Sequence, residues 1–431
     1  MAANLKASAS TTSKLFQEAL TVKKKLIAAA VVSAFAAPVA FAQTAPANVT
    51  IYGSLQMEVF SQSGDGANGN PDYNRRNAVS SPGVFFVGFR GQESLGGGLN
   101  AIWQIEQGAG GDGTGTTNTW GGRNTFIGLS GGFGRVFAGI FDSPYKRVMG
   151  INNTPMMRIG LTGPQGINAI MNNGDTSGSA SQTNVRVNPT TGVVEATTVA
   201  NATAFSRRTA NSLNYESPSF GGFTVAAQYG ANEGRVATGA GANPSLYSLS
   251  GTYRGGPFAV GLGWQQHKEF RGVGLDDSSY VVSASWTSGP FLIQGAYSKF
   301  MYETGPAGDL KRDNWLIGGA YAVGNHRFRL NYQQANDTKG ATGAIGAGST
   351  AIGNVGVFNG SGTDTGAKIW SVNYGYLLSK RTEVYAFYSN LNNDANGRTN
   401  FAGSAALTGV TGGGLRGMDS DIFGVGIAHT F

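Results

Sequence analysis

Apolar and polar residues alternate one by one along much of this 431-residue chain, in segments separated by glycine-rich or polar stretches. Residues 258–265 (FAVGLGWQ) show the pattern, because every second residue is large and apolar and those between are small or polar. The same alternation recurs at 280–287, 327–333 and 370–376. A repeat of two residues predicts β-strands with one apolar and one polar face.

The connections between these segments are alternately short and long. Seven are short turns, such as 255–257 and 289–290, and the eight between them are longer polar loops, such as 62–80 and 144–206. Fifteen connections of this kind imply sixteen antiparallel strands. The predicted strands are residues 48–61, 82–92, 98–107, 122–130, 135–143, 207–217, 223–230, 244–254, 257–267, 278–288, 291–303, 314–323, 326–337, 367–378, 381–392 and 419–431.

Short turns at one end of a sheet and long loops at the other are typical of outer-membrane β-barrels. An open sheet cannot span lipid, because the backbone groups at its edges would have no hydrogen-bond partners. The pattern therefore predicts an all-β fold, a 16-stranded antiparallel transmembrane β-barrel that is wide enough for an aqueous channel. A secreted or surface β-protein, such as an adhesin or a glycan-binding sandwich without a pore, stays open as the alternative, since its strands also alternate.

Residues 1–42 have the order of an export signal. Three lysines at Lys23–Lys25 precede the apolar run 26–37, and Ala40–Ala42 (AFA) follows as a cleavage site with small residues. We therefore expect a signal peptide region at 1–42, cut after Ala42, and a mature β-barrel domain at 43–431.

Residues 1–21 stand ahead of the usual beginning of such a signal. An over-extended reading frame with its true start at Val22 would account for them. The lysines of the leader contribute to the net charge of +7, and no basic stripe follows them, so nucleic acid is not an expected partner.

Composition narrows the chemistry that the chain can carry. Charged residues make up 13%, and cysteine is absent, which excludes disulfide scaffolds, cysteine-ligated metals and thiol catalysis. The histidines His267, His326 and His429 fall on different predicted strands and form no metal-ligand pair. A glycine pattern at 108–113 lacks the following helix that nucleotide binding needs. We expect neither an enzyme nor a bound cofactor.

Several segments resemble a known family. Residues 211–223 (NSLNYESPSFGGF) are similar to the signature of the general porins of Gram-negative outer membranes. Residues 49–53, 88–96 and 429–431 resemble the first strand, the second strand with its turn, and the last strand of those porins. The likeness extends over the mature chain and points in particular to the trimeric porins of β-proteobacteria.

The resemblance implies a homotrimer in the cell outer membrane, in contact with lipid and lipopolysaccharide. Each barrel would form a water-filled channel for passive diffusion of ions and small hydrophilic solutes, narrowed by an inward-folded third loop at 144–206. Because open edges are excluded in lipid, Phe431 is expected to close the last strand against the first.

Basic side chains on the predicted polar face are the candidate pore-lining residues. Arg123 and Arg208 match positions of a basic wall in the porins, and alternation puts Arg123 on the face opposite to Phe126. We expect both arginines at the narrowest zone. The other candidates are Arg90, Arg254, Arg327 and Arg329 on strands, and Lys146 and Arg158 in the third loop.

These residues predict a moderate preference for small anions, because a basic constriction raises the local concentration of anions. Acidic residues are sparse along the third loop, so little is expected to offset the positive charge. The preference is moderate because Phe86, Asn214 and Ala428 stand where the family commonly has arginine. That the arginines merely solvate a polar face stays open as the alternative.

Overall fold

The computed structural model describes most of the region that the sequence assigns to strands. The predicted signal region 1–42, its cleavage site and Arg158 lie outside the described residues. Among the helices that the structure describes, none has the length and apolar character needed to cross a membrane. The described residues are 49–66, 72–80, 85–108, 120–152, 170, 182–187, 194–199, 204–231, 243–270, 274–303, 308–340, 364–397, 399, 401 and 417–431.

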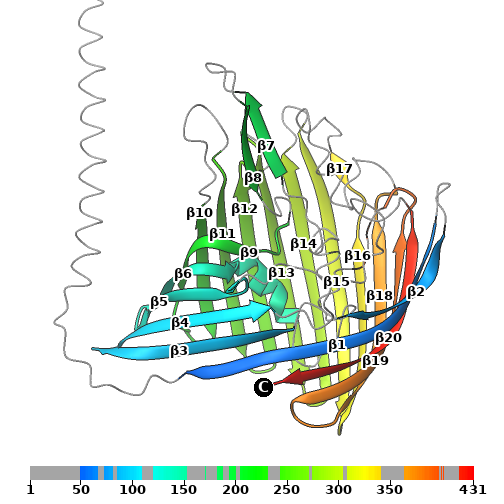
Figure 1. Cartoon of the computed structure of the whole chain (residues 1–431), viewed down its shortest axis with the longest axis horizontal. Helices are drawn as coiled ribbons and strands as arrows, with labels where there is room; N and C mark the ends of the chain where they lie inside the picture. The colour runs from blue at the N-terminus through cyan, green and yellow to red at the C-terminus, as the bar shows by residue number, and fades with distance from the viewer. Residues whose placement is uncertain are drawn as a thin grey trace, which may run out of the picture.

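Sixteen strands form one closed antiparallel barrel (Figure 1). All sixteen predicted strands are confirmed, with bounds that differ by at most five residues. These strands close into one sheet, which excludes the alternative fold of two stacked sheets. The strands are β1 (Thr50–Asp65), β3 (Phe86–Gly96), β4 (Leu99–Gly108), β5 (Thr125–Gly131), β6 (Gly134–Asp142), β9 (Arg208–Glu216), β10 (Phe223–Ala231), β11 (Ser245–Gly255), β12 (Phe258–Lys268), β13 (Asp276–Ser288), β14 (Phe291–Glu303), β15 (Asp309–Val323), β16 (His326–Ala335), β18 (Ala367–Leu377), β19 (Thr382–Asn393) and β20 (Asp419–Thr430).

The last strand closes the barrel against the first. β20 pairs with β1 over most of its length, and the amide N of Phe431 donates to the carbonyl O of Gly53 at 3.2 Å. The Phe431 ring lies 2.5 Å from the position that a Cβ at Gly53 would occupy, so a side chain does not fit there. The expected closure at Phe431 is confirmed. Phe423, Val425 and Ile427 of β20 are 46–57% exposed on the outer face.

Three further pairings lie where the sequence predicted only loops. β2 (Tyr73–Ser80) pairs with β1, β17 (Lys339–Gly340) pairs with β15, and β7 (Gln182–Val187) and β8 (Val194–Val199) form a separate two-stranded sheet. The assignment of 62–80 to a loop was therefore wrong. β3 pairs only with the first residues of β1, and β2 supplies the partner that the remaining edge of β1 needs.

The outer face of the barrel is apolar, as the alternation predicts. On β12, Phe258, Val260 and Leu262 are 40–57% exposed, whereas Gln265 and His267 of the same strand are fully buried on the inner face. The barrel thus presents apolar side chains outward and polar side chains inward, which is the arrangement that lipid outside and water inside require.

Phe126 departs from the sequence prediction, which placed it on the outer face. Its ring is 8% exposed and packs with Phe137 and Phe141 on the inner face, with ring centroids 4.5–5.3 Å apart. The neighbouring Ile127 takes the outer face and is 70% exposed. The prediction counted alternate residues from Arg123 to Phe126. β5 begins only at Thr125, so this count started in a segment that is not a strand, where the faces do not alternate.

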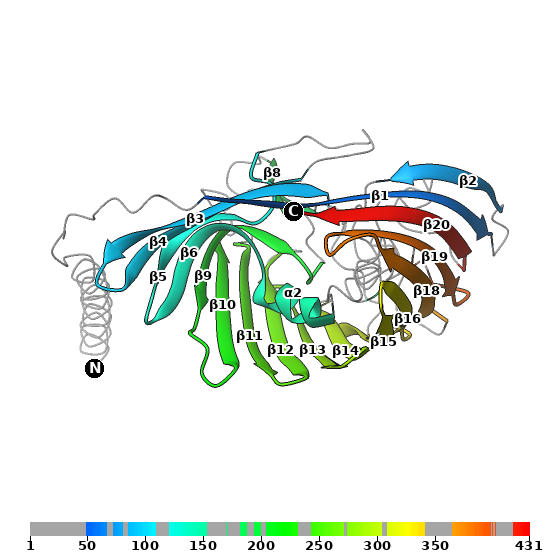
Figure 2. The same cartoon turned by 90° about the horizontal axis from the view of Figure 1, so that it is seen from below.

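A short helix follows β6 directly. α2 (Pro144–Met149) and the 3-10 turn η1 (Gly150–Asn152) lie inside the ring of strands in Figure 2. The hydroxyl of Ser143 accepts a hydrogen bond from the amide N of Lys146 at 3.2 Å, and a proline follows at the first helical position. This combination begins helices well, because it satisfies a free amide and presets the backbone angle.

Candidate functional site

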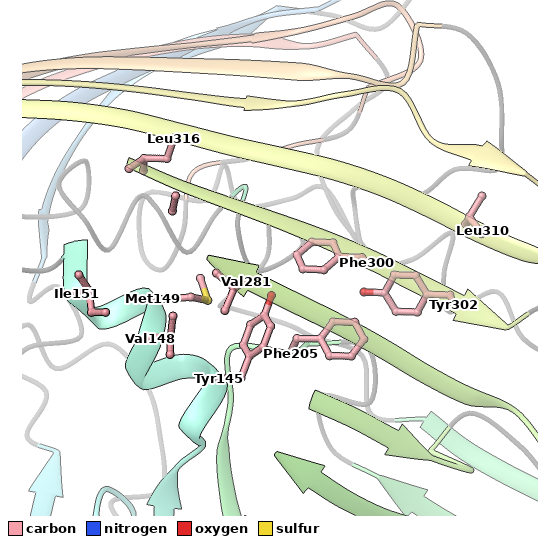
Figure 3. Close-up of a cluster of buried hydrophobic side chains, with 11 residues drawn as sticks. Tyr145, Val148, Met149, Ile151, Phe205, Val281, Phe300, Tyr302, Leu310 and Leu316 are labelled. Atoms are coloured by element: carbon pink, nitrogen blue, oxygen red, sulfur yellow. The ribbon is translucent and has the colours of Figure 1, made fainter. Parts of the chain in front are cut away.

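α2 lies against the inner wall that β11, β12 and β13 form. The amide N of Tyr145 donates to Ser248 Oγ at 3.1 Å, and the Tyr145 hydroxyl is 2.7 Å from Ser279 Oγ. Figure 3 shows Tyr145 and Val148 turned toward Val281 of β13, within a cluster of buried apolar side chains. Polar and apolar contacts together therefore fix the first turn of the third loop to the barrel wall.

Two glycines of β12 make room for this helix. A Cβ at Gly261 would lie 2.6 Å from Ile151 Cδ1 and 3.1 Å from Val148 Cγ1. A Cβ at Gly263 would lie 3.1 Å from Tyr145 Cα, which belongs to the helix backbone. The wall is thus recessed where α2 lies, so the helix sits closer to the strands than side chains would allow.

A second point of the third loop contacts another part of the wall. Ile170 is fully buried, and its carbonyl O accepts a hydrogen bond from Arg312 Nη2 of β15 at 3.2 Å. Ile170 also belongs to one apolar cluster with Phe60 of β1 and Ile422 of β20. The described parts of the loop therefore contact β11–β13 at one point and β15 at another, where Ile170 joins the apolar cluster.

One carboxylate holds two cations where β6, α2 and β9 meet. Asp142 Oδ1 lies 2.8 Å from Lys146 Nζ and 3.2 Å from Arg208 Nε. Asn124 donates to Asp142 Oδ2 at 3.0 Å and accepts from Arg208 Nε at 2.9 Å. Arg208 is therefore held in one orientation, and one positive charge of this group is not offset.

Arg123 pairs with a second carboxylate. Its Nε lies 3.5 Å from Glu106 Oε2, and its guanidinium lies over the Phe86 ring, 4.5 Å from the ring centroid. The Tyr52 hydroxyl donates to Glu106 Oε1 at 2.9 Å. Phe86, which stands where an arginine is common in the porins, therefore supports the side chain of the neighbouring Arg123 instead.

Glu216 holds a third group together. Arg135 Nη2 of β6 lies 2.6 Å from Glu216 Oε2, and Arg147 of α2 forms an ion pair with the other oxygen. Glu216 belongs to the signature segment 211–223. The acid of that segment thus ties α2 to two neighbouring strands, which the sequence pattern did not indicate.

These contacts build a basic wall on the inner face of β3, β4, β6 and β9, together with α2 and with Arg123 just ahead of β5. Three carboxylates offset half of its six positive charges and leave an excess of three. The expectation that little would offset the positive charge, which rested on the sparse acids of the third loop, was therefore wrong, because the carboxylates come from strands. The basic wall consists of Arg90, Glu106, Arg123, Arg135, Asp142, Lys146, Arg147, Arg208 and Glu216.

Three of the predicted pore-lining residues lie away from the basic wall. Arg329 is 5% exposed, and its Nη1 lies 2.6 Å from Glu383 Oε1, so this pair contributes no net charge. Arg327 donates to backbone carbonyls of the adjacent turn, and Arg254 is exposed near the end of β11.

The charge of Lys146 is expected to respond to pH. Removal from water inside the barrel lowers the pKa of Lys146, and the nearby Asp142 counteracts this only in part. As pH rises, Lys146 therefore loses its proton before an ordinary lysine does, and the excess positive charge falls. We expect the preference for anions, measured as reversal potential in a salt gradient, to decline as the solution is made alkaline, at a lower pH than the titration of an ordinary lysine would require.

Lys146→Arg is the matched control for this expectation, because arginine keeps its charge throughout that range. The alkaline decline should disappear in the variant and persist in the native chain. An identical pH profile in both would contradict the assignment to Lys146.

Comparison with known proteins agrees with this architecture. A family model described as Gram-negative porin matches residues 28–396. The chain belongs to the Gram-negative porin family. The resemblance inferred from the sequence is confirmed, and the porin is a protein of the outer membrane.

Curated relatives of this porin match over part of its length. The major outer membrane protein P.IB of Neisseria gonorrhoeae is 40% identical over 126 residues, which are 29% of this chain and 34% of the relative. The protein of the same name from Neisseria lactamica is 35% identical over 185 residues, 42% of this chain and 43% of the relative. The porin therefore matches less than half the length of these relatives.

Solved structures share the barrel. An anion-selective porin from Comamonas acidovorans aligns with a TM-score of 0.61 at 22% identity, over 89% of this chain and all of that one. The trimer form of OmpT from Vibrio cholerae aligns with a TM-score of 0.58 at 15% identity, over 89% of this chain and 99% of the other. At these identities the likeness is one of fold.

Proposed function

We propose that this porin forms a water-filled channel for passive diffusion of ions and small hydrophilic solutes across the outer membrane. The observation that carries the proposal is the closed barrel whose inner face is polar and whose outer face is apolar. Barrels of sixteen strands are wide enough for an aqueous lumen. The family is one of channels, and the reaction chemistry of an enzyme has no part in this proposal.

The proposed channel prefers small anions. The excess of three positive charges on the basic wall supports this preference, since a charged wall in a pore attracts ions of opposite sign. The ion pairs of Lys146 and Arg147 on α2 with Asp142 and Glu216 support a role for the beginning of the third loop in this preference. The three carboxylates keep the preference moderate.

The proposed assembly is a homotrimer. β5 has 7 residues and β6 has 9, whereas β14 has 13 and β15 has 15. A strand that crosses a membrane needs about 9–11 residues, so the wall is too short at β5, and only just long enough at β6, to face lipid over its full height. Two further copies of the chain would cover that wall, and the remaining apolar outer face would contact lipid and lipopolysaccharide.

Reversal potentials in planar bilayers test the channel and its preference together. The purified porin should conduct and should prefer chloride over potassium in a KCl gradient. Arg123→Ala with Arg208→Ala removes two of the six wall cations and should shift the potential toward potassium, more strongly at low salt, where screening is weaker.

Lys380→Ala with Arg381→Ala is the control for this experiment, because it removes the same charge from an exposed turn. The control should leave the reversal potential unchanged. A native porin that already prefers potassium, or a wall variant that behaves like the control, would contradict the proposed role of the wall.

A further inference from the structure

Four arginines of the basic wall lie over aromatic rings. Each guanidinium carbon is 4.5–5.5 Å from a ring centroid, and all four pairs belong to the inner face of neighbouring strands or to α2. The pairs are Arg90 over Tyr52, Arg123 over Phe86, Arg135 over Phe137 and Arg147 over Phe141.

The rings form two continuous patches. Tyr52 and Phe86 meet edge to face at 6.1 Å, which makes one patch with Arg90 and Arg123 above it. We call this the Tyr52 patch. The second, the Phe137 patch, consists of Phe126, Phe137 and Phe141, each of which contacts the other two. The basic wall is therefore a set of cations resting on an aromatic surface rather than isolated charges in water.

An aromatic ring changes what its arginine binds best. The ring removes water from one face of the guanidinium, while the Arg123 and Arg147 side chains remain 23% and 31% exposed toward the lumen. A guanidinium is planar and weakly hydrated, it stacks on aromatic rings, and its nitrogens match the two oxygens of a carboxylate. An anion that is planar, aromatic and carboxylated fits both properties at once.

Small inorganic anions fit less well. Sulfate and phosphate are strongly hydrated. Binding to a guanidinium that has one face covered by an aromatic ring would remove part of this hydration shell, which is unfavourable. Acetate offers the carboxylate but no ring to stack on the guanidinium or on Tyr52 and Phe86 of the patch. Arg90 of the Tyr52 patch is exposed, and among the described residues no acid of the wall forms an ion pair with it. Its guanidinium is therefore the part of the patch that can bind a carboxylate.

We infer that the basic wall selects aromatic carboxylates over small hydrated anions, so that aromatic acids are a preferred solute class of this channel. The inference rests on the proposed channel function and refines its substrate. Glu106 and Glu216 hold Arg123, Arg135 and Arg147 in place and keep the affinity moderate, as passage through a pore requires.

Current block in planar bilayers tests the inference in the native porin. Potassium benzoate, cyclohexanecarboxylate and acetate are added in turn to a chloride-conducting pore, and the concentration that halves the chloride current is measured. All three carry one negative charge, and the first two have similar size, so their difference isolates the aromatic ring. Benzoate should block at a concentration about threefold to tenfold lower than cyclohexanecarboxylate, and acetate should be weakest.

Variants of the Tyr52 patch locate the effect. Tyr52→Leu with Phe86→Leu removes both rings and keeps every charge, so the advantage of benzoate over cyclohexanecarboxylate should be lost. Tyr52→Phe with Phe86→Tyr keeps both rings and should retain the advantage. Phe223→Leu with Phe291→Leu removes two rings from the exposed outer face and should behave like the native porin.

The outcomes separate this inference from the function on which it rests. A pore that conducts and prefers chloride but ranks benzoate with cyclohexanecarboxylate overturns the inference alone, and the native porin suffices for that result. Retention of the benzoate advantage in the folded Tyr52→Leu/Phe86→Leu pore also overturns it. Absence of any conductance would overturn the proposed channel as well.

Discussion

Gly263→Val is expected to reduce the single-channel conductance of this porin by roughly twofold or more, because it displaces α2 toward the lumen. A Cβ at residue 263 would lie only 3.1 Å from Tyr145 Cα and 3.4 Å from Val148 Cβ. Tyr145 Cα belongs to the helix backbone, so it cannot turn aside as the end of a flexible side chain can. The two methyl groups of valine extend further into the space that the helix occupies, so α2 has to move away from β12.

The same substitution is expected to lower the free energy of unfolding by about 1–3 kcal/mol, as overpacking does. Gly251→Val is the matched control: it adds the same atoms to the neighbouring strand β11, where no heavy atom lies within 4 Å of the Cβ position. Conductance in bilayers and heat-modifiable migration of the folded barrel measure the two effects. Native conductance in a folded Gly263→Val pore would contradict the inference that α2 packs against β12 because residue 263 has no side chain.

The barrel was predictable because each residue of a strand carries information about its face. Alternation and loop length located all sixteen strands, and the exclusion of open edges from lipid required β1 and β20 to meet. The method failed where the chain was irregular. The count from Arg123 gave the wrong face for Phe126, and the pairing of β2 with β1 had no signal in the alternation of 62–80.

The site was less predictable because its contacts join residues that are distant in the chain. Arg135 and Glu216 are 81 residues apart, and only the pairing of β6 with β9 brings them together. The absence of an arginine at Phe86 suggested a weaker wall, but the structure shows Arg123 resting on that ring. The residue type at position 86 does not tell whether the wall has only lost a positive charge or has gained a ring that supports the neighbouring Arg123.

Glu216→Gln is expected to increase the preference of the channel for anions by about twofold in the chloride-to-potassium permeability ratio at low salt. The substitution raises the excess charge of the basic wall from three to four, because Glu216 alone offsets charge for both Arg135 and Arg147. Glutamine keeps the size and a carbonyl acceptor, so α2 retains a hydrogen bond to β9.

Comparison with Glu216→Ala separates charge from attachment. Alanine removes the same charge and also the acceptor that holds Arg147, so the anion preference should rise equally, whereas fluctuations of the open-channel current should increase only in this variant. Glu93→Gln, which removes an exposed acid near the end of β3, is the control and should leave the permeability ratio unchanged. A shift toward potassium in Glu216→Gln would show that Glu216 does not offset charge in the conducting path, since neutralising an acid there can only favour anions. Equal current noise in the three variants would show that the packing of α2 against β12 at Gly261 and Gly263 holds the helix in place without Glu216.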